Sequence, residues 1–574
     1  RLADVSAGGE IKIRADGVEA VSELLQRFFD QQVPTVGSPQ ELAERMARLT
    51  RFIRDTLINI FQQEGKSGKL HIQLNTFREL LVPDLKPEQF ADMYAQTIAY
   101  GLFAARVNAP LNEDSPRIHA AIKLVETNAF LGRLFYQIAG PDLDMSVAYA
   151  ADDLAGLLAR VDMDAILQNF GKRTRQDDPV RHFYETFLAA YDPKLREKRG
   201  VYYTPEPVVS YIVKSLDYLL KTRFSRPMGL ADTETLILDP AVGTATFLYS
   251  VVNNIHDTLV EIGQEGAWKS YVPQHLIPRL FGFELLMAPY AVAHLKLSVL
   301  FNELGYKLSK DERLNIFLTN ALEEPIQREE TLGFAGFISE EGNQAADIKK
   351  NKPIMVVLGN PPYSVSSANK GKYIDDLMAL YKEAVRGERN IQPLSDDYIK
   401  FIRFAHGRIK RTGYGVIGMI TNHSYLSGLI HRGMRKALMD DFSEIYVLDL
   451  HGNSLMKEQP PEGGKDENVF DIQQGVAISL FVRQNGVGRT AKVYHADLWG
   501  LRENKYRWLS ENDVRTTEWC ELKPGVTSNY FFVPKDFDLQ AEYEKGWSVA
   551  DIFPVNSTGI KTHRDHFVID FDEA

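Results

Sequence analysis

Cysteine and long apolar segments are both scarce in this sequence. The chain has one cysteine, Cys520, among 574 residues, which excludes a disulfide framework or a multi-cysteine zinc site within it. A single thiol is typical of proteins in a reducing cytoplasm. No apolar run reaches the length of about 20 residues that a transmembrane helix needs, and no secretory signal peptide is visible. We therefore expect a cytoplasmic protein without a membrane segment.

The sequence also lacks the loop that binds nucleoside triphosphates. Gly65, Lys66 and Ser67 resemble the end of that loop, but the glycine required earlier in it is replaced by Ile60. No separated set of Asp, Glu and Lys on strands indicates a nuclease. We expect neither a motor nor a nuclease within these residues. The 574 residues are enough for about three domains with sizeable cores, and the content of 44% apolar and 11% aromatic residues is typical of a folded globular protein.

The most informative motif is the tetrapeptide Asn360, Pro361, Pro362 and Tyr363, which follows an apolar run at 354–359. The exocyclic amine of adenine is a poor nucleophile because its lone pair is delocalised into the ring. The Asn360 side-chain oxygen and a backbone carbonyl of the proline turn can accept its two N–H groups and localise that lone pair. The prolines fix φ, and Tyr363 offers a flat face for an extruded base. The alternative is a turn that only ends a strand.

A second motif lies upstream, where apolar residues 236–238 lead into a short loop and a helical stretch. The loop contains Asp239, Pro240, Ala241, Val242, Gly243 and Thr244. Doubly wound folds bind nucleotide-like cofactors at such a strand–loop–helix junction, and Gly243 permits the close approach of a ligand. Because no phosphate-binding lysine follows, S-adenosylmethionine fits better than a nucleoside triphosphate. The alternative is an ordinary strand-to-helix turn.

A third motif precedes the second. Tyr203, Thr204 and Pro205 stand at the start of an apolar pattern with helical spacing, so a helix is predicted to begin at the prolines. Thr204 and the exposed N–H groups at that start are candidates to hold the amino-acid end of the cofactor.

Together, and in this order, the three motifs resemble the gamma class of amino-methyltransferases that act on DNA. The resemblance implies a doubly wound, Rossmann-like α/β methyltransferase fold that uses S-adenosylmethionine. It implies that Asn360, Pro361, Pro362 and Tyr363 carry catalysis and that Tyr363 stacks on a flipped adenine. It implies cofactor contacts from Tyr203, Thr204, Pro205, Asp239, Pro240, Ala241, Gly243 and Thr244.

Four further positions are interpreted from the same resemblance. Glu284, which ends the segment 281–284, is placed on the ribose hydroxyls of the cofactor, and Asn320 is placed where the family often has an Asp near its adenine. Phe470 is the candidate for a second aromatic face on the flipped base, with a core phenylalanine as the alternative. Ala245 departs from the family, which usually has another glycine there. Alanine would be strained if that position needs positive φ, and we interpret it as a tolerated variant.

The remaining pattern predicts the architecture around these motifs. Apolar runs at 414–420, 444–450 and 476–482 predict buried strands, and 398–410 is predicted to be helical. Residues from about 20 to 195 are predicted to form a helical domain. Its first long helix is indicated by a capping box at Ser38 and Glu41, followed by an amphipathic stripe. Such a stripe is usually core, so no site is assigned there.

With the helical region included, most of the chain resembles the coupler and methyltransferase part of type ISP restriction–modification enzymes. The resemblance implies a helical coupler-like domain over 1–195 and a methyltransferase domain over 196–503. It implies that 504–574 are a linker and the start of an incomplete target-recognition domain, which 559–565 resemble. Nuclease and specificity segments are then expected elsewhere in the same polypeptide, in a prokaryotic cytoplasm.

The function expected from this is site-specific transfer of a methyl group to adenine N6 in duplex DNA, within a restriction–modification or phage-defence system. The net charge of −11 fits a DNA partner least well, since phosphates attract Lys and Arg. Positive charge is nevertheless clustered locally. The clusters are Lys194, Arg196, Lys198 and Arg199; Arg403, Arg408, Lys410 and Arg411; and Arg432, Arg435 and Lys436. We expect one of them to contact DNA.

Other functions remain open from the sequence. Methyltransferases for protein glutamine or ribosomal-RNA guanine use the same tetrapeptide, although they are generally shorter. A non-catalytic scaffold that senses DNA or cofactor is a further alternative, against which intact Asn360 and Tyr363 argue. Methylation at a pyrimidine ring carbon needs a cysteine nucleophile after a proline, whereas Cys520 follows Trp519. A metal is not expected.

Overall fold

The computed structural model describes residues 3–5, 11–13, 36, 38–111, 114–127, 129–163, 165–166, 179–192, 204–309, 312–329, 333–364, 367–486 and 491–555. The chain divides into two compact units, 1–532 and 533–574. At the N-terminus, β1 (Ala3–Val5) pairs antiparallel with β2 (Ile11–Ile13). The second unit contains two short helices, α20 (Gln540–Tyr543) and α21 (Val549–Ile552).

Helices form the N-terminal part of the first unit. They are α2 (Pro39–Gln63), α3 (Lys69–Leu80), α4 (Pro87–Asn108), α5 (Pro116–Thr127), α6 (Ala129–Ala139), α7 (Met145–Ala159) and α9 (Pro179–Tyr191). The predicted cap starts α2: Ser38 Oγ accepts a hydrogen bond from Glu41 N at 3.2 Å, and Pro39 follows it. The predicted apolar stripe of α2 packs against α4, α7 and α9.

A nine-stranded sheet forms the centre of the first unit. Its order is β11-β10-β8-β9-β7-β6-β3-β4-β5. The strands are β3 (Ile237–Asp239), β4 (Leu280–Glu284), β5 (Asn315–Leu318), β6 (Val356–Gly359), β7 (Gly415–Asn422), β8 (Glu444–Asp449), β9 (Val476–Arg483), β10 (Lys492–Asp497) and β11 (Cys520–Leu522). Only β9 and β11 run antiparallel to their neighbours within this sheet. The predicted α/β class is confirmed.

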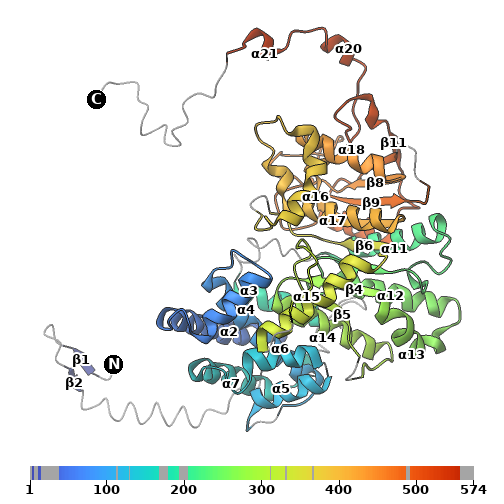
Figure 1. Ribbon diagram of the computed structural model, residues 1–574. Coiled ribbons are helices and arrows are strands. Elements are labelled where there is room, and N and C mark those ends of the chain that lie inside the picture. The colour runs from blue at the N-terminus through green and yellow to red at the C-terminus, as the bar shows by residue number, and fades with distance from the viewer. Residues whose placement is uncertain are drawn as a thin grey trace, which may run out of the picture. The chain divides into compact units, whose positions relative to one another are not determined.

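Helices connect and cover these strands (Figure 1). They are α11 (Glu206–Arg223), α12 (Thr246–Glu261), α13 (Trp268–Tyr271), α14 (Met287–Glu303), α15 (Gly333–Asn351), α16 (Lys372–Lys382), α17 (Asp397–Thr412), α18 (Arg432–Asp441) and α19 (Arg502–Glu511). Short turns of other helix types are η1 (Gly229–Ala231), η2 (Glu265–Ala267), η3 (Val272–Leu276), η4 (Ile277–Arg279), η5 (Glu383–Val385), η6 (Gln392–Ser395), η7 (His423–Leu426), η8 (Leu429–His431) and η9 (Pro524–Val526). Both α11 and α17 contact the central strand β7.

The helical region packs directly on the sheet domain. Helix α4 contacts α14, and α3 contacts α15 (Figure 1). Phe77 and Phe334 stack across this contact with ring centroids 6.5 Å apart. Arg328 Nη1 also donates to the carbonyl of Leu80 at 3.0 Å. These contacts bring the end of α3 to the edge of the sheet where the strands β3 to β6 end.

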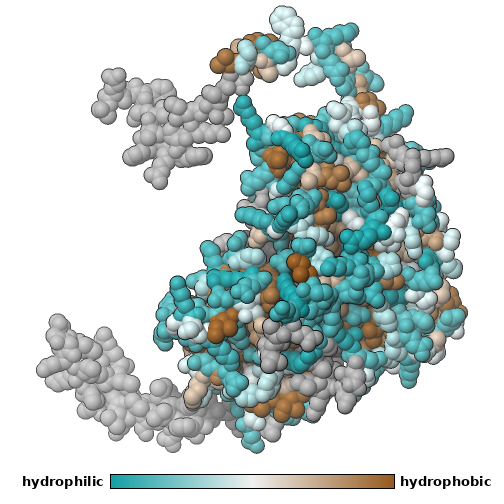
Figure 2. Space-filling model, viewed as in Figure 1, coloured by the Kyte–Doolittle hydropathy of each residue, from teal (hydrophilic) through white to brown (hydrophobic). Residues whose placement is uncertain are grey.

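Residues 504–532 also pack with the sheet. Strand β11 pairs with β10, and the Tyr211 hydroxyl lies 2.7 Å from Thr517 Oγ1. The first compact unit extends to residue 532, and the expected domain bounds at residues 195 and 503 stay a prediction. On the face seen in Figure 2, hydrophobic residues are scattered among hydrophilic ones. Within the described part of the chain, no helix combines the length and apolar character needed to cross a bilayer.

Candidate active site

A cavity of about 640 Å³ lies where the parallel strands β3 to β6 end. Residues at or directly after the end of each strand line it: 240–244 at β3, 284–286 at β4, 319–321 at β5, and Asn360 and Pro362 at β6. Thr204, residues 81–86 from the helical region and residues 367–370 are also part of its wall. The carboxyl ends of parallel strands meet at one edge of a sheet. This topology brings together motifs that are far apart in the sequence.

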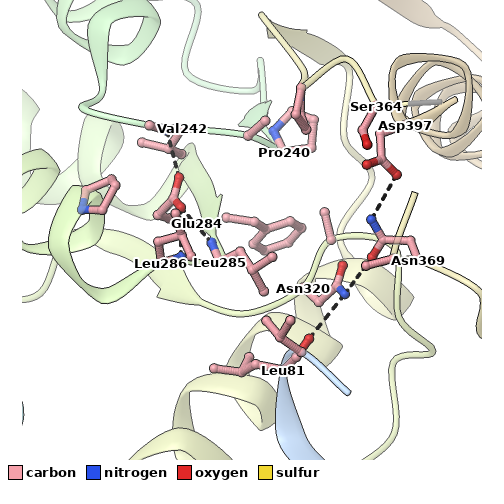
Figure 3. Close-up of a pocket in the computed structure, with 18 of the residues that line it drawn as sticks. Leu81, Pro240, Val242, Glu284, Leu285, Leu286, Asn320, Ser364, Asn369 and Asp397 are labelled. Carbon is pink, nitrogen blue, oxygen red and sulfur yellow. Dashed lines mark hydrogen bonds between the residues drawn. The ribbon is translucent and has the colours of Figure 1, made fainter. Parts of the chain in front are cut away.

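Glu284 organises one side of the cavity, on the left in Figure 3. Its Oε2 accepts a hydrogen bond from Gly243 N at 2.9 Å, and its Oε1 accepts from Leu285 N at 2.9 Å and Leu286 N at 2.8 Å. Burial raises the pKa of Glu284 to about 7, although the three N–H groups oppose this rise. The carboxylate thus ties the loop after β3 to the start of α14.

Asp239 is buried behind that loop. Its Oδ1 accepts a hydrogen bond from Ala241 N at 3.0 Å, while its buried Oδ2 has no hydrogen-bond partner. Burial is the main cause that raises the pKa of Asp239 to about 8, and the nearby Glu284 adds to it. Gly359 at the end of β6 packs against this carboxylate: a Cβ on Gly359 would lie 2.8 Å from Asp239 Oδ1. The end of β6 therefore has room for the Asp239 carboxylate because residue 359 has no side chain.

The two positive-φ positions of the β3 loop differ in residue type. Gly243 has φ +55°, which glycine adopts without strain. Ala245 has φ +62° and ψ +31°, so the alanine is in the left-handed conformation that the sequence suggested would strain it. Ala245 is fully buried and caps the start of α12.

Asn360 is held by hydrogen bonds at both ends of its amide. Its Nδ2 donates to Thr204 Oγ1 at 3.0 Å, and its Oδ1 accepts from the Tyr363 hydroxyl at 3.1 Å. The Tyr363 hydroxyl also lies 3.4 Å from the carbonyl of Ile420 in β7. Asn360 and Thr204 both line the cavity. The structure thus joins two of the motifs through one side-chain amide.

The chain after the tetrapeptide is anchored to the start of α17. Ser364 N donates to Asp396 Oδ1 at 2.7 Å, and the Tyr363 ring meets the Tyr398 ring edge-on with centroids 6.0 Å apart. Burial raises the pKa of Asp396 to about 6. These contacts fix the direction in which the chain leaves Pro362.

Asn320 closes the opposite side of the cavity, as Figure 3 shows. Its Nδ2 donates to Asn369 Oδ1 at 2.9 Å and lies 3.4 Å from the carbonyl of Leu81. Its Oδ1 accepts from Leu322 N at 3.0 Å. Asn369 in turn donates to Asp397 Oδ1 at 3.0 Å. No sequence pattern predicted a role for Leu81 or Asn369, because neither lies in a motif and each reaches Asn320 only through the tertiary fold.

The remaining predicted site residues are not among those that line the cavity. Pro205 caps α11, and Pro361 is buried; neither lines the cavity. Phe470 is 4% exposed in the connection between β8 and β9 and also does not line the cavity. Its stacking on a base stays a prediction. Tyr203 lies outside the described residues.

Several arginines of the basic clusters are buried. Arg408 donates to the carbonyls of Ile348 and Lys352, and Arg435 donates to those of Tyr425, Gly428 and Asn529. Arg403 Nε donates to the carbonyl of Leu377. These three guanidinium groups satisfy backbone acceptors and do not form an exposed phosphate-binding surface. The cluster at 194–199 lies outside the described residues.

Comparison with known proteins identifies the segment that builds this cavity. Residues 175–450 match the model of the N-6 DNA methylase family. The match covers just under half of the chain, and this segment is similar to that family. The matched segment contains all three motifs and the strands β3 to β8. The sequence-based recognition is confirmed.

Individual proteins are similar to this chain over part of their length. The Type II methyltransferase M.BstVI of Geobacillus stearothermophilus is 26% identical over 227 residues, which are 39% of this chain and 35% of that protein. The structure of the ATP-dependent Type ISP restriction–modification enzyme LlaBIII bound to DNA matches with a TM-score of 0.64 at 22% identity, over 88% of this chain and 33% of its own. The DrdV–DNA complex matches with a TM-score of 0.64 at 23% identity, over 92% of this chain and 50% of its own. At these identities the structural matches establish the fold, and this chain spans half or less of each of these proteins.

Proposed function

We propose that this chain is the methyltransferase part of a restriction–modification enzyme and transfers a methyl group from S-adenosylmethionine to N6 of a flipped adenine in duplex DNA. The observation that carries the proposal is the placement of Asn360. Its amide, fixed by Thr204 and Tyr363, lies in the same cavity as Glu284 and Gly243. The N-6 DNA methylase family supports the reaction class. The partner and substrate are inferred from the proteins that this chain resembles.

The residues of the cavity fit S-adenosylmethionine. Glu284 presents a carboxylate suited to ribose hydroxyls, and Gly243 lets a ligand approach the backbone. Apolar residues such as Val242, Phe247 and Phe283 complete a lining suited to a nucleoside. We assign Thr204, Pro240, Ala241, Gly243, Thr244, Glu284 and Asn320 to the cofactor side of the cavity. When bound, the cofactor supplies an electrophilic methyl group on its sulfonium.

Asn360 has the chemistry to activate the target amine. Its Nδ2 donates to Thr204 and so orients the amide, and its Oδ1 is the atom that can accept a hydrogen bond from the substrate amine. In the proposed complex, Oδ1 accepts one N6–H beside or in place of its bond from the Tyr363 hydroxyl, while a carbonyl of the Pro361–Pro362 turn accepts the other N6–H. Both bonds strengthen as positive charge develops on the attacking nitrogen. Transfer is direct, and the proton is lost to solvent.

Transfer of radiolabelled methyl to duplex DNA tests the proposal in the full-length polypeptide that contains this chain. We expect Asn360→Ala to lower kcat by about 10²-fold or more, since it removes a group that acts in the transition state. Binding of S-adenosylmethionine, measured by calorimetry, should change far less. Asn351→Ala is the matched control because Asn351 is exposed at the end of α15. Its transfer rate should equal that of the parent protein.

A panel of duplex DNA, RNA and protein substrates separates the other possible functions. Methylation of protein or RNA in preference to DNA would overturn the DNA assignment. Binding of cofactor without transfer to any DNA would indicate a scaffold. An unchanged rate for Asn360→Ala would refute the role of Asn360.

A further inference from the structure

A second cluster of ligating side chains lies beyond the ends of β7, β8 and β10. His423 follows β7, His451 follows Asp449 at the end of β8, and Asp497 ends β10. Glu458 joins them from the connection between β8 and β9. One nitrogen of each histidine and a carboxylate oxygen of Glu458 lie within 4.8 Å of one another. The cluster lies outside the lining of the cavity described above.

His423 is oriented by a carboxylate. Its Nδ1 lies 2.9 Å from Asp449 Oδ1, and because a carboxylate only accepts hydrogen bonds, Nδ1 carries the proton. The lone pair of the neutral ring is then on Nε2. That nitrogen lies 3.8 Å from Glu458 Oε1. It also lies 3.4 Å from Asn453 Nδ2, and a metal ion, as a stronger partner for the lone pair, can replace this long hydrogen bond.

His451 is also oriented by a carboxylate, but the roles of its two ring nitrogens are exchanged relative to His423. Its Nε2 lies 2.9 Å from Asp497 Oδ1 and donates to it, so the lone pair of the neutral ring is on Nδ1. Nδ1 is buried without a hydrogen-bond partner, 3.9 Å from Glu458 Oε2, and the residue is 7% exposed. Trp499 stacks on the ring with centroids 3.3 Å apart. The backbone of His451 has φ +51°, a strained conformation that fixes the ring direction.

We propose that His423 Nε2, His451 Nδ1 and Glu458 bind one divalent transition-metal ion, with Zn²⁺ as the best-fitting metal. Two imidazoles and a carboxylate are a common ligand set for Zn²⁺, which leaves a further position for water. The carboxylates behind the rings are the outer partners that orient histidine ligands in metal sites. Zn–N bonds of about 2.0–2.1 Å place tetrahedral donors about 3.3 Å apart, so the donors here, which lie within 4.8 Å of one another, draw together when the ion binds.

The surrounding charge favours a cation at this place. Asp449, Asp497 and Glu458 place three carboxylates around the two histidines, and the ammonium of Lys505 lies close enough to be influenced by Asp449 and Glu458. Lys505 Nζ is already bound 2.7 Å from Asp466 and donates to the carbonyls of Leu450 and Glu467. A proton on His451 Nδ1 is the competitor for the metal. Binding the ion therefore releases that proton and leaves the Asp497 contact intact.

The ion would tie the connection between β8 and β9 to the end of β7. That connection starts at His451, contains Glu458, and includes Phe470. His423 is the anchor outside it. We therefore expect metal binding to stabilise the 451–475 connection.

Calorimetric titration of the chelator-treated, tag-free protein with ZnCl₂ tests the site, and CoCl₂ gives a visible absorption band that reports the coordination. We expect one equivalent of Zn²⁺ to bind and Glu458→Gln to weaken binding at least tenfold. Glu462→Gln is the matched control, since Glu462 is exposed in the same connection and outside the cluster. His451→Asn, which suits positive φ, should also weaken binding at least tenfold. Cys520→Ser should leave binding unchanged.

Equal affinities of Glu458→Gln and Glu462→Gln would overturn the site. So would the failure of the parent protein to bind one equivalent, or loss of binding in Cys520→Ser. A melting temperature that rises with Zn²⁺ in the parent and in Glu462→Gln, but not in Glu458→Gln, would support the tie between the connection and β7. These readouts do not depend on methyl transfer.

Discussion

Asn360 Nδ2 donates a hydrogen bond to Thr204 Oγ1 at 3.0 Å, across 156 positions of sequence. The bond joins the residue after β6 to the residue just before the cap of α11. It fixes the orientation of the Asn360 amide, whose Oδ1 is directed toward the Tyr363 hydroxyl. Because the bond is made by a side chain on each partner, it can be removed without altering either backbone.

Thr204→Val should lower kcat for methyl transfer by about 3–10-fold, the equivalent of one lost hydrogen bond of about 1 kcal/mol. Valine keeps the shape of the buried threonine, but the Asn360 amide loses the acceptor that fixes its orientation. Single-turnover methylation rates measure the effect. The matched control is Thr222→Val, at an exposed threonine near the end of α11. If both variants methylate equally fast, the Thr204 contact has no positioning role.

Tyr363→Phe should lower kcat by about 2–10-fold, whereas Tyr363→Ala should lower it further. Phenylalanine keeps the aromatic face but removes the hydroxyl that donates to Asn360 Oδ1. Alanine also removes the ring. Rates with duplex DNA separate the two contributions, and Tyr149→Phe, at a residue 68% exposed on α7, is the control. Equal losses in both Tyr363 variants would assign the whole effect to the hydroxyl.

Gly359→Ala should destabilise the fold by about 1–3 kcal/mol, the cost of a strained backbone conformation. Gly359 has φ +152°, and an added Cβ would lie 2.8 Å from Asp239 Oδ1. The melting temperature measures the loss. Gly156→Ala is the comparison, because Gly156 lies within α7 and has open space around its Cβ position. Gly156→Ala should be slightly more stable than the parent. A similar fall in melting temperature in both variants would contradict the close contact between Gly359 and Asp239.

Asp239→Asn should make the ligand-free protein less sensitive to pH between about 4 and 8. Burial raises the pKa of Asp239 to about 8 from 3.8, so the folded state retains a proton that the unfolded state has lost in this window. The free energy of unfolding of the parent therefore falls as pH rises, by up to about 1.4 kcal/mol per pH unit. The pKa of Glu284, raised to about 7, acts in the same direction in both proteins.

Denaturant unfolding at pH 5 and pH 8 measures this difference. The advantage of Asp239→Asn over the parent should be larger at pH 8. Asp257→Asn, at an acid exposed on α12, should follow the parent at both pH values. If the parent gained stability relative to Asp239→Asn on going to pH 8, the sign of the pKa shift would be wrong.

The strands and motifs were accessible to sequence analysis because their signals are local. Continuous apolar runs predicted β6, β7, β8 and β9 to within a few residues. Proline and a capping serine marked the start of α2 in the same way. The short strand β11, in contrast, has exposed residues and no apolar run, and the sequence did not predict it.

Long-range partners were not accessible in this way. The carbonyl of Leu81 reaches Asn320, and Glu284 binds Gly243 N, only because separate segments meet at one edge of the sheet. The exposure of charged residues also depends on distant segments. Arg408 and Arg435 belong to basic clusters in the sequence, but the fold buries them against backbone carbonyls.

The sequence by itself determined the order of strands, loops and helices, because hydrophobic runs, prolines and glycines act on the nearest few residues. It also determined which residue types end the strands. Only the tertiary structure decided that Thr204 holds Asn360, that Asn320 is bound to Asn369, and that His423, His451 and Glu458 lie together. These contacts depend on how the strands align at one edge of the sheet, and that alignment is set by packing between distant segments.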